Sequence, residues 1–425
     1  MIATHWPTKR LRDITSKIGS GATPRGGKES YLSSGISLIR SLNVYDFKFE
    51  KADLAFISDE QAADLSNVVV QRDDILLNIT GASVARCCLT DPRYLPARVN
   101  QHVAIVRVRP EAADARFVLY CINSPHFKSR LLSLAQGGAT REALTKTTIE
   151  DFEVLQPSLP VQRRIAGILS AYDDLIENSQ RRIRILEEMA RRLYREWFVH
   201  FRFPGHESCR LVESTLGEIP EGWAICKLND FVQFKSGFAF KSGTFTADGE
   251  HRLVTIKNVQ DGVFNPESDT RMSEVPANMP TYCVLNNKDI ILSLTGNVGR
   301  VCLVHDGPFL LNQRVSKLAP VVAFDWAMVY CMFRQPEMRV KLEQLSNGVA
   351  QQNLSPILAS KIDFAQPPQE LRRRFSIMAE PIGVSIVQLY TTIQTLRRTR
   401  DLLLPRLLSG QIDVEALPEP VLSEP

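Results

Sequence analysis

The sequence has no long hydrophobic run, and its first residues do not resemble a secretory leader. None of its apolar stretches approaches the roughly 18 residues that a membrane-spanning helix needs. The N-terminal stretch MIATHWPTKR lacks the apolar core of a signal peptide. With 425 residues and ordinary apolar and charged fractions, the chain is long enough for two or more domains with cores of their own. We therefore expect a globular protein of the cytoplasm.

Metal-binding patterns are missing as well. The eight cysteines form no CxxC pair and no Cys/His cluster of the zinc type, and the seven histidines are scattered. Cys88 and Cys302 stand at matching places in two similar halves of the chain, as do Cys121 and Cys331. Each of the four lies in an apolar run, so we predict reduced core thiols there and no metal site.

Familiar catalytic motifs are absent too. The chain contains no GxxxxGK[ST] phosphate loop and no GxSxG, and no Asp/Glu-x-Lys nuclease constellation stands out. GSGATP begins like a dinucleotide fingerprint, but Pro24 stands where the third glycine belongs, so we predict a turn. AQPPQE lacks the Asn or Asp that an amino-methyltransferase signature has before Pro367. We expect no catalytic residue and no cofactor in this chain.

The net charge is small, and the basic residues are unevenly distributed. The formal charge is +4, yet arginine-rich runs occur at RRIRILEEMARRLYRE and RRTRDLLLPRLL. Local basic patches on a nearly neutral chain suit a protein that touches DNA at chosen surfaces. A well-solvated helix would account equally well for either run taken alone.

One feature that is present is an internal repeat. DDILLNITG at 73–81 is similar to KDIILSLTG at 288–296, and the segments that follow them, VARCCL and VGRVCL, are also similar. VNQHVAIVRV likewise answers LNQRVSKLAP, in the same order. Such self-similarity over half a chain indicates one duplicated domain. We interpret the repeated phrase as a buried strand with its exit turn, and not as an active-site motif.

Each repeat unit mixes strands and helices. Runs such as VVVQRDDILLNITG and HVAIVRVRP are rich in Val and Ile and bounded by Gly, Pro or Asp, which predicts strands. The stretches 115–135 and 325–345 show helical spacing. A glycine-containing loop follows each of them, QGGATREAL and SNGVAQQNL. The fold class is therefore α/β (α+β), with two globular domains in tandem.

A long heptad pattern follows each globular unit. Apolar residues recur at alternating steps of four and three, which predicts two helices of about 60 Å at about 1.5 Å per residue. Ser179, Ala190, Ala379 and Arg400 belong to the same register, with Ser179 and Arg400 as polar interruptions. The expected helix seam comprises Ile165, Leu169, Tyr172, Ile176, Ile183, Leu186, Leu193, Trp197, Ile382, Ile386, Leu389, Ile393, Leu396 and Leu403, with Phe375 and Leu407 at its ends.

Prolines mark the borders of these helices. Pro160 and Pro368 stand where a helix start tolerates proline, and Pro204 follows the first helix. Pro405 lies inside the second pattern, so we predict a kink near Leu404 or an early end there. The predicted domains are 1–158 and 222–366 (globular), 159–203 and 367–412 (coiled-coil regions), 204–221 (linker) and 413–425 (tail).

The repeated order of globule and helix suggests how the helices pair. Two seams of equal length and register can pack antiparallel as a coiled coil, which would give a pseudo-twofold molecule with a spacer of defined length. The alternative is two independent domains whose helices bind other chains.

Polar loops of the globular units provide candidates for DNA contacts. Arg and Lys suit guanine edges and phosphates, Asn and Gln suit adenine, and hydroxyls suit phosphates. The loops differ between the copies while the apolar frame is kept, so the copies would read two different short sequences. The candidates are Thr23, Arg25, Lys28, Arg40, Asn43, Arg98, Gln101, His102, Thr140 and Arg141 in the first copy, and Lys235, Lys241, Lys257, Asn258, Gln313, Arg314, Gln351, Gln352 and Asn353 in the second.

Residues that are identical in both copies have a different interpretation. Asn100-Gln101 recurs as Asn312-Gln313, and Arg86 recurs as Arg300. Identical residues are poor candidates for reading different bases. We expect them to serve the shared fold or a shared contact with the DNA backbone.

These features together resemble the specificity subunit of Type I restriction–modification enzymes. The resemblance covers essentially the whole chain. It is carried by the two repeated phrases with NQH and NQR, by PSLPVQRRIAGIL, and most specifically by LYREWFVHFRFPGHE followed by LGEIPEGW. The family alternates two target recognition domains with two helical regions.

The resemblance implies a function that the residues alone could not name. Each recognition domain would read one half of a split double-stranded DNA target, while the antiparallel helices set the gap between the halves. The helices would dock two methylation subunits that carry S-adenosylmethionine and methylate adenine. Restriction subunits would add ATP- and Mg-dependent translocation and cleavage. This chain would contribute specificity and no chemistry.

Two other classes of function stay open on the residues. A stand-alone DNA-modifying enzyme with its own recognition domains would need a cofactor site. A coiled-coil scaffold would bind other proteins without a preference for DNA, and it would leave two differing sets of loops unexplained.

Overall fold

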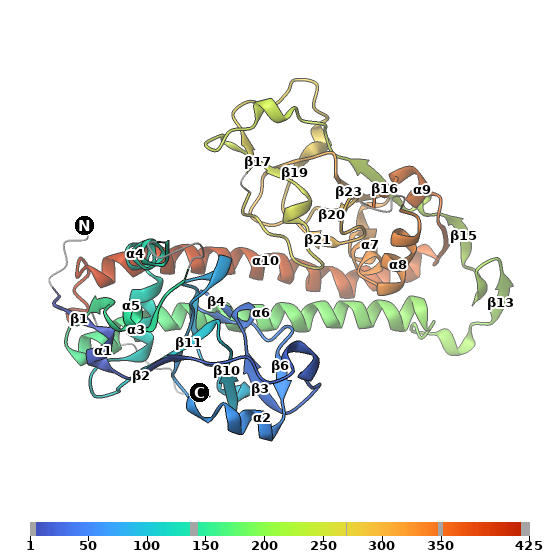
Figure 1. Ribbon diagram of the computed structural model, residues 1–425. Coiled ribbons are helices and arrows are strands. Elements are labelled where there is room, and N and C mark those ends of the chain that lie inside the picture. The colour runs from blue at the N-terminus through green and yellow to red at the C-terminus, as the bar shows by residue number, and fades with distance from the viewer. Residues whose placement is uncertain (1–5, 137–142, 269, 347–351, 418–425) are drawn as a thin grey trace. The chain divides into compact units, whose positions relative to one another are not determined.

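The computed structural model describes residues 6–136, 143–268, 270–346 and 352–417 (Figure 1). The chain forms two units, each with its own core. Unit 1 comprises Met1–Leu175 and Leu396–Pro425, and unit 2 comprises Ile176–Thr395. Both borders fall inside long helices, so each unit combines a globular part with portions of two helices. The predicted domain boundaries, which follow the chain, stay predictions.

Unit 1 is built on two four-stranded sheets and a two-stranded one. The order β2-β11-β8-β9 is antiparallel throughout, and in the order β6-β3-β10-β7 the neighbours β3 and β10 run parallel. The strands are β1 (Thr8–Arg10), β2 (Thr15–Ser20), β3 (Ile36–Ile39), β6 (Ala55–Ile57), β7 (Val69–Val70), β8 (Ile75–Asn78), β9 (Cys87–Leu89), β10 (Ala97–Val99), β11 (Val103–Val108) and β12 (Glu153–Leu155), plus the hairpin of β4 (Val44–Tyr45) and β5 (Lys48–Phe49).

Unit 2 repeats the topology of the two four-stranded sheets and of the β1-β12 pair. Its sheets have the orders β16-β23-β20-β21 and β18-β17-β22-β19, again with one parallel pair, β17 and β22, and β15 pairs with β24 as β1 pairs with β12. The strands are β15 (Ala224–Lys227), β16 (Val232–Ser236), β17 (His251–Val254), β18 (Arg271–Met272), β19 (Val284–Leu285), β20 (Ile290–Ser293), β21 (Val301–Leu303), β22 (Phe309–Leu311), β23 (Val315–Pro320) and β24 (Asp363–Gln366). The predicted duplication and the mixed α/β class are confirmed.

The repeated phrase forms the same buried strand in each unit. Asp74 and Asp289 directly precede β8 and β20, and each pairs with a cation on the neighbouring strand, Arg107 at 2.7 Å and Lys317 at 2.7 Å. The residue before each acid has a positive φ, 63° at Asp73 and 78° at Lys288. The two acids therefore fasten neighbouring strands, and the interpretation as a strand with its exit turn is confirmed.

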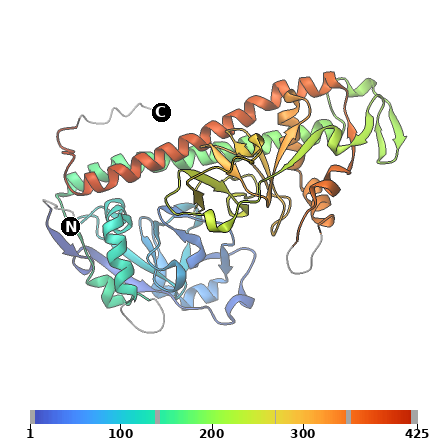
Figure 2. The same ribbon diagram turned by 90° about the horizontal axis from the view of Figure 1, so that it is seen from above.

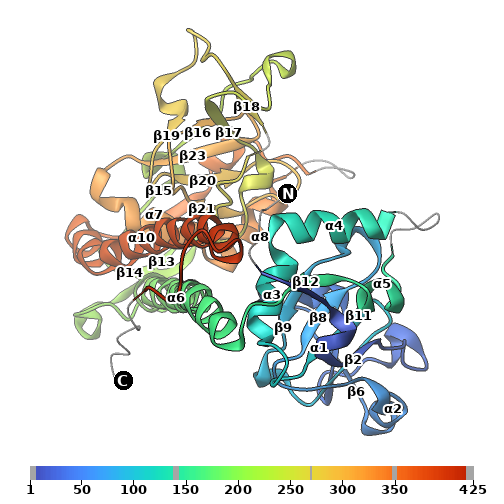
Figure 3. The same cartoon turned by 90° about the vertical axis from the view of Figure 1, so that its left-hand side faces the viewer.

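Short helices accompany the sheets. Figure 3 shows α3 (Ala115–Asn123) and α5 (Lys146–Glu150) beside the sheet that contains β2 and β9. Unit 1 also contains α1 (Leu11–Ile14), α2 (Asp59–Asp64) and α4 (Pro125–Gln136), and unit 2 contains α7 (Trp326–Phe333), α8 (Pro336–Gln344) and α9 (Pro356–Ser360). The helical structure expected over 115–135 and 325–345 is confirmed. Each stretch forms two helices, because the residue before Pro125 or Pro336 is held in an extended conformation.

Two long helices follow the globular parts, α6 (Leu159–Tyr194) and α10 (Gln369–Leu408). A π-helical turn, Arg195–Val199, continues α6, and the hairpin of β13 (Leu211–Ser214) and β14 (Gly217–Pro220) lies in the predicted linker. Figures 1 and 2 both show α6 and α10 side by side.

The two helices run antiparallel within each unit. In unit 1, Ile165 and Leu169 of α6 share a core with Leu407 of α10. In unit 2, Trp197 lies beyond the C-terminal end of α6, and its ring lies 5.7 Å from that of Phe375 near the start of α10. Early residues of one helix therefore meet late residues of the other, as predicted.

The seam residues that sequence periodicity singled out lie on the inner sides of these helices. Ile165, Leu169, Ile176, Ile183, Trp197, Ile386, Leu389 and Ile393 are buried, and Tyr172, Leu186, Leu193, Ile382, Leu396 and Leu403 are half-buried. Of the polar interruptions, Ser179 is buried, and the buried Arg400 pairs with Asp173 and lies over the ring of Phe47.

Pro405 does not end the second helix. α10 continues to Leu408, and the N–H of Ser409 still donates to the carbonyl oxygen of Pro405 at 3.0 Å. The expected early end at Leu404 is wrong. One reason is that Pro405 lies in the last helical turn, where a missing N–H removes a single backbone bond, while the buried neighbours Leu404, Leu407 and Leu408 hold the turn in the core of unit 1.

The predicted core thiols are confirmed. Cys88, Cys121, Cys302 and Cys331 are free and buried. Burial raises the pKa of Cys121 and that of Cys88 above the ordinary value of a thiol. These side chains therefore stay protonated and pack as small apolar groups.

Gly383 is required by a close contact in unit 2. A Cβ at this position of α10 would lie 2.6 Å from the ring of Trp326, whose indole N–H donates to the carbonyl oxygen of Lys288 at 2.8 Å. Glycine to alanine in a helix ordinarily stabilises by about 1 kcal/mol. Here the added methyl group would clash with the rigid indole, and the cost of overpacking, about 1–3 kcal/mol, exceeds the gain in helix propensity. We expect Gly383→Ala to lower the free energy of unfolding, measured by urea denaturation.

A second glycine provides the control. Gly167 lies in α6, and a Cβ added there would have no described atom within 4 Å apart from the neighbouring backbone of the helix itself. Gly167→Ala is expected to raise the free energy of unfolding slightly. Equal stabilisation by both substitutions would contradict the assigned role of Gly383.

Candidate nucleic-acid interface

A polar hollow lies where β8 ends in unit 1. The strand leaves the sheet at Thr80 and Gly81, and the N–H of Ile79 donates to the carbonyl oxygen of His102, which stands just before β11, at 3.0 Å. This backbone bond brings the turn after β8 against the NQH segment. The hollow has a volume of about 360 Å³ and is lined by Ser41, Thr80, Gly81, Ala82, Ser83, Arg86 and His102.

Side-chain hydrogen bonds hold the imidazole in this hollow. Nδ1 of His102 lies 2.6 Å from Oγ1 of Thr80, and Nε2 lies 3.0 Å from the amide nitrogen of Gln101. The backbone N–H of His102 donates to the side-chain oxygen of the buried Asn100 at 3.1 Å. Gln101 and His102, both predicted DNA contacts, thus meet at one place, and the repeated Asn100 shapes the loop that carries them.

The loop after β2 comes close to the same region. The N–H of Gly21 donates to the carbonyl oxygen of Asn100 at 3.1 Å, and a Cβ on Gly21 would lie 1.6 Å from the carbonyl oxygen of Val99. The same holds in unit 2, where a Cβ on Gly237 would lie 2.2 Å from the carbonyl oxygen of Asn312. Glycine serves here for a close approach of two backbones. The turn predicted for GSGATP (19–24) lies just beyond it, at Arg25-Gly26, because Gly19 and Ser20 still belong to β2.

The remaining candidates of unit 1 are dispersed. Thr23, Arg25 and Lys28 lie in the loop after β2, and Arg25 lies 3.9 Å from Asp64. Arg40 donates to the carbonyl oxygen of Asp53 and lies 5.2 Å from the ring centre of Tyr31.

Arg98 is directed towards α2. Its Nε donates to the carbonyl oxygen of Ala62 at 3.0 Å, and burial lowers the pKa of this guanidinium. Thr140 and Arg141 lie outside the described residues.

Two predicted base readers are part of the fold. Asn43 is fully buried, and its amide accepts from the N–H of Arg40 and donates to the carbonyl oxygens of Glu50 and Ala52. Asn258 makes the corresponding bonds in unit 2, with Thr255 as the donor and with Asn265 and Glu267 as the acceptors. Both amides are satisfied inside the protein, so these two assignments are corrected: the residues shape a loop and cannot reach a base.

The candidates of unit 2 lie around the equivalent strand end. Gln313 and Arg314 stand just before β23, and the N–H of Leu294 donates to the carbonyl oxygen of Arg314 at 3.0 Å, as Ile79 does to His102. The carbonyl oxygen of Gln352 accepts from Gly296, and Oδ1 of Asn353 accepts from Oγ1 of Thr295 at 3.1 Å.

The lysines of unit 2 are more scattered. Lys235 lies 5.6 Å from the ring centre of Tyr282, and Lys241 and Lys257 are exposed. Gln351 lies outside the described residues.

Some residues that line the hollow were not predicted as DNA contacts from the sequence. Ser41, Thr80 and Ser83 were not among the candidates, and Arg86 was expected to serve the shared fold or a shared contact with the DNA backbone. The signal available was the Thr-Gly pair that closes both repeated phrases, at Thr80 and Thr295.

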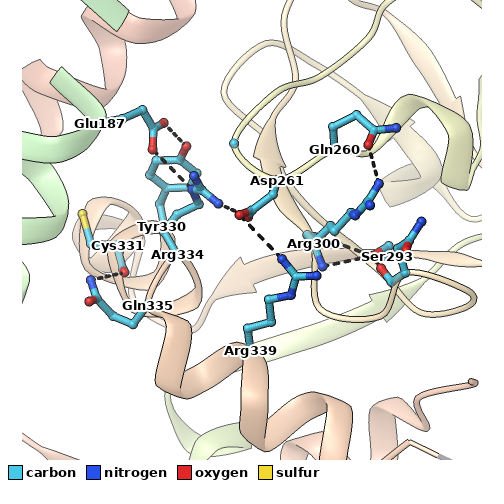
Figure 4. A network of polar contacts seen from close by, with 12 residues as sticks. Glu187, Gln260, Asp261, Ser293, Arg300, Tyr330, Cys331, Arg334, Gln335 and Arg339 are labelled. Atoms are coloured by element: carbon cyan, nitrogen blue, oxygen red, sulfur yellow. Dashed lines mark hydrogen bonds and ion pairs between the residues drawn. The ribbon is translucent and has the colours of Figure 1, made fainter. Parts of the chain in front are cut away.

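Unit 2 also contains a charged network in which Arg334 and Glu187 are buried and Asp261 is exposed (Figure 4). Nε of Arg334 lies 3.3 Å from Glu187 of α6, and the same guanidinium bonds to Asp261. The hydroxyl of Tyr330 donates to Glu187. Burial opposes the charge of Arg334, but Tyr330, Glu187 and Asp261 outweigh it and raise the pKa of Arg334. The network joins the globular part of unit 2 to α6.

Within the described ranges, no cluster of three or more His, Cys, Asp or Glu residues could hold a metal ion. Among the helices of those ranges, none combines the length and hydropathy that crossing a membrane requires.

Comparisons with known proteins agree with this architecture. The family model described as "Type I restriction modification DNA specificity domain" matches residues 4–188 and again 220–367. The MjaIX specificity subunit of Methanocaldococcus jannaschii is 26% identical over 429 residues, covering 98% of this chain and 95% of that protein. The HindI specificity subunit of Haemophilus influenzae is 24% identical over 359 residues, covering 70% of this chain and 76% of that protein.

A solved structure shares the fold. The crystal structure of a Type I restriction–modification S subunit from M. genitalium superposes with a TM-score of 0.58 at 17% identity and covers 95% of this chain and 96% of that one. The two family-model matches together span well over half of the chain. The chain therefore belongs to the family of Type I restriction–modification DNA specificity subunits.

Proposed function

We propose that this protein is the subunit that gives a Type I restriction–modification complex its DNA sequence specificity. Each globular domain reads one half of a two-part double-stranded target, and the paired helices set the gap between the halves. The observation that carries the proposal is a strand topology repeated in both units, with different polar side chains at equivalent strand ends. His102 in one copy and Arg314 in the other are an example.

The proposal assigns no chemistry to this chain. Two methylation subunits dock on the helices and bring S-adenosylmethionine, and restriction subunits bring ATP and Mg²⁺. The location of the complex is the cytoplasm, where its DNA substrate is accessible. A stand-alone DNA-modifying enzyme would need a cofactor site of its own, and S-adenosylmethionine binding by the isolated chain would support that rival.

Methylation mapping tests the function directly. We expect a host that carries this chain and its methylation subunit to show methylated adenines in one two-part motif, and a host without this chain to lose that pattern. At the same salt concentration, the purified complex should bind a duplex that contains the motif more tightly than a scrambled duplex. An unchanged methylation pattern after deletion would refute the proposal.

The spacing role has its own test. Inserting one heptad after Arg181 in α6 and one after Tyr390 in α10 keeps both seams in register and lengthens the pair by about 10 Å. The mapped motif is then expected to acquire about 3 additional unread base pairs, at about 3.4 Å per pair. The same heptad in α6 alone should disrupt the pairing. A double insertion that folds and leaves the gap unchanged would refute the role of the helices.

A further inference from the structure

The turn after the repeated strand has the same construction in both units. Thr80-Gly81 follows β8 and Thr295-Gly296 follows β20, and the glycines have positive φ angles of 72° and 75°. The carbonyl oxygen of an arginine accepts a strand-end N–H in each case: Arg86 from Asn78 at 2.8 Å, and Arg300 from Ser293 at 3.0 Å. Each turn therefore has an arginine beside it at a defined place.

These arginines differ from the structural arginines of the same chain. Arg107, Arg334 and Arg372 each pair with a carboxylate. The guanidinium of Arg86 lies 5.0 Å from the ring centre of Tyr45, and that of Arg300 donates to the neutral amide oxygen of Gln260 (Figure 4). In the part of the chain that the structure describes, neither has an ion pair with a carboxylate. Their positive charge is thus not neutralised by the described residues.

Hydroxyl groups accompany this charge in unit 1. The hollow that Arg86 lines is also lined by Ser41, Thr80 and Ser83, and by the ring of His102. Guanidinium and hydroxyl donors around an open hollow suit an oxyanion with several acceptor oxygens. In unit 2 the corresponding place has Arg300 and the exposed Arg314, while the buried Thr295 hydroxyl donates to Oδ1 of Asn353 at 3.1 Å. Both copies therefore place a cationic side chain beside one strand end, and unit 1 adds hydroxyl groups to it.

The identity of these residues in both copies indicates what they contact. If the two domains read different half-targets, base-reading residues must differ between them. His102 and Arg314 differ, as do Ser41 and Ile256. Thr80, Gly81 and Arg86 recur as Thr295, Gly296 and Arg300. A group that is the same in every half-target is the phosphate of the DNA backbone.

We propose that Arg86, beside the Thr80-Gly81 turn, and Arg300, beside the Thr295-Gly296 turn, each hold one backbone phosphate of the bound DNA. The inference rests on the proposed function, because it presupposes that both domains bind DNA. The two contacts position the domains on the duplex, and the differing neighbours then read bases. Arg86 and Arg300 are positioning residues and not specificity residues.

The test measures binding against salt concentration. The complex of this chain with its methylation subunit is titrated with a random-sequence duplex and with the mapped target. Each neutralised phosphate contributes about 0.9 to the slope of log K against log salt. Arg86→Ala and Arg300→Ala are each expected to reduce that slope by about 1, and the double substitution by about 2, on both duplexes. The mapped methylation motif is expected to stay the same.

Matched variants separate this role from a general loss of charge or folding. Arg109 stands at the opposite end of β11 from His102, so Arg109→Ala should leave the slope unchanged. Arg86→Lys and Arg300→Lys keep the charge and should retain the slope. If an alanine variant unfolds in a thermal melt, the glutamine variant, which keeps a long side chain, replaces it in the same titration.

The outcomes separate the inference from the proposed function. Wild-type complex that fails to prefer the mapped target would remove the proposed function itself. Wild-type complex that binds normally, with alanine variants of unchanged slope, would overturn the phosphate contact alone. An altered motif after Arg86→Ala or Arg300→Ala would show base reading and would also overturn it.

Discussion

Replacing Arg334 with alanine is expected to lower the free energy of unfolding by about 3–5 kcal/mol. The Arg334 side chain is 8% exposed, and it faces the Glu187 carboxylate, which is 11% exposed, at 3.3 Å. Removing the guanidinium leaves Glu187 buried with the hydroxyl of Tyr330 as its remaining side-chain partner in the network of Figure 4. A buried charge without its counter-ion is costly, because desolvation is no longer offset.

A neighbouring arginine is the matched control. Arg339 on α8 pairs with Glu343 at 2.9 Å and lies 3.7 Å from Asp261, but its side chain is 35% exposed. Solvent screens such pairs, so Arg339→Ala should cost at most about 1 kcal/mol. Replacing Glu187 and Arg334 together with methionine should recover much of the loss, because no uncompensated charge stays buried. Equal, small losses for Arg334→Ala and Arg339→Ala in urea denaturation would contradict the assignment.

Acidification is expected to destabilise the protein through His305. This residue is fully buried, and burial lowers its pKa from 6.5 to about 4, although the carbonyl of Phe264 and the nearby Asp306 oppose the shift. Its ring stacks on that of Tyr390 of α10, with 4.7 Å between centres. As the pH falls through 6.5, His305 becomes protonated in the unfolded chain but stays neutral in the folded protein. Stability is therefore lost between pH 6.5 and about 4.

The size of this loss follows from the shift of the pKa. A difference of this magnitude corresponds to about 3 kcal/mol over the whole window. His305→Asn should be less stable than wild type at pH 7.5 and should lose less stability on going to pH 5. His200→Gln, which alters an exposed histidine, should follow the wild-type pH profile. Parallel profiles for wild type and His305→Asn in chemical denaturation would refute the assignment.

Periodicity and repetition made much of this fold predictable. The strand at 73–81 and its echo could be recognised because a strand and its exit turn are local structures, set by a short apolar run and a glycine. The two long helices were predictable for the same reason, since the heptad pattern of Ile165 to Trp197 needs no knowledge of distant residues. The effect of prolines was harder to predict: Pro125 and Pro336 each begin a second helix within a stretch of helical spacing, whereas Pro405 is tolerated in the last turn of α10.

The candidate interface was predictable only in part. Gln101 and His102 were singled out because of their residue types, and they do line or flank the hollow after β8. Asn43 had an equally suitable residue type, yet its amide is used inside the loop. A side chain's chemistry is visible in the sequence, but its access to solvent is not, because access depends on which distant segments fold over it.

Sequence alone therefore predicted the duplicated α/β architecture, the heptad seams and the resemblance to a family, because all three depend on patterns that are regular along the chain. The antiparallel packing of the seams was decided by the folded structure. The folded structure was needed to show that, among the described residues, Arg86 and Arg300 form no ion pair with a carboxylate, whereas Arg334 forms a buried ion pair with Glu187. It was also needed to join Thr80, Arg86 and His102 in one hollow. These residues lie on separate segments of the chain, and the pairing of β8 with β9 and β11 brings the segments together.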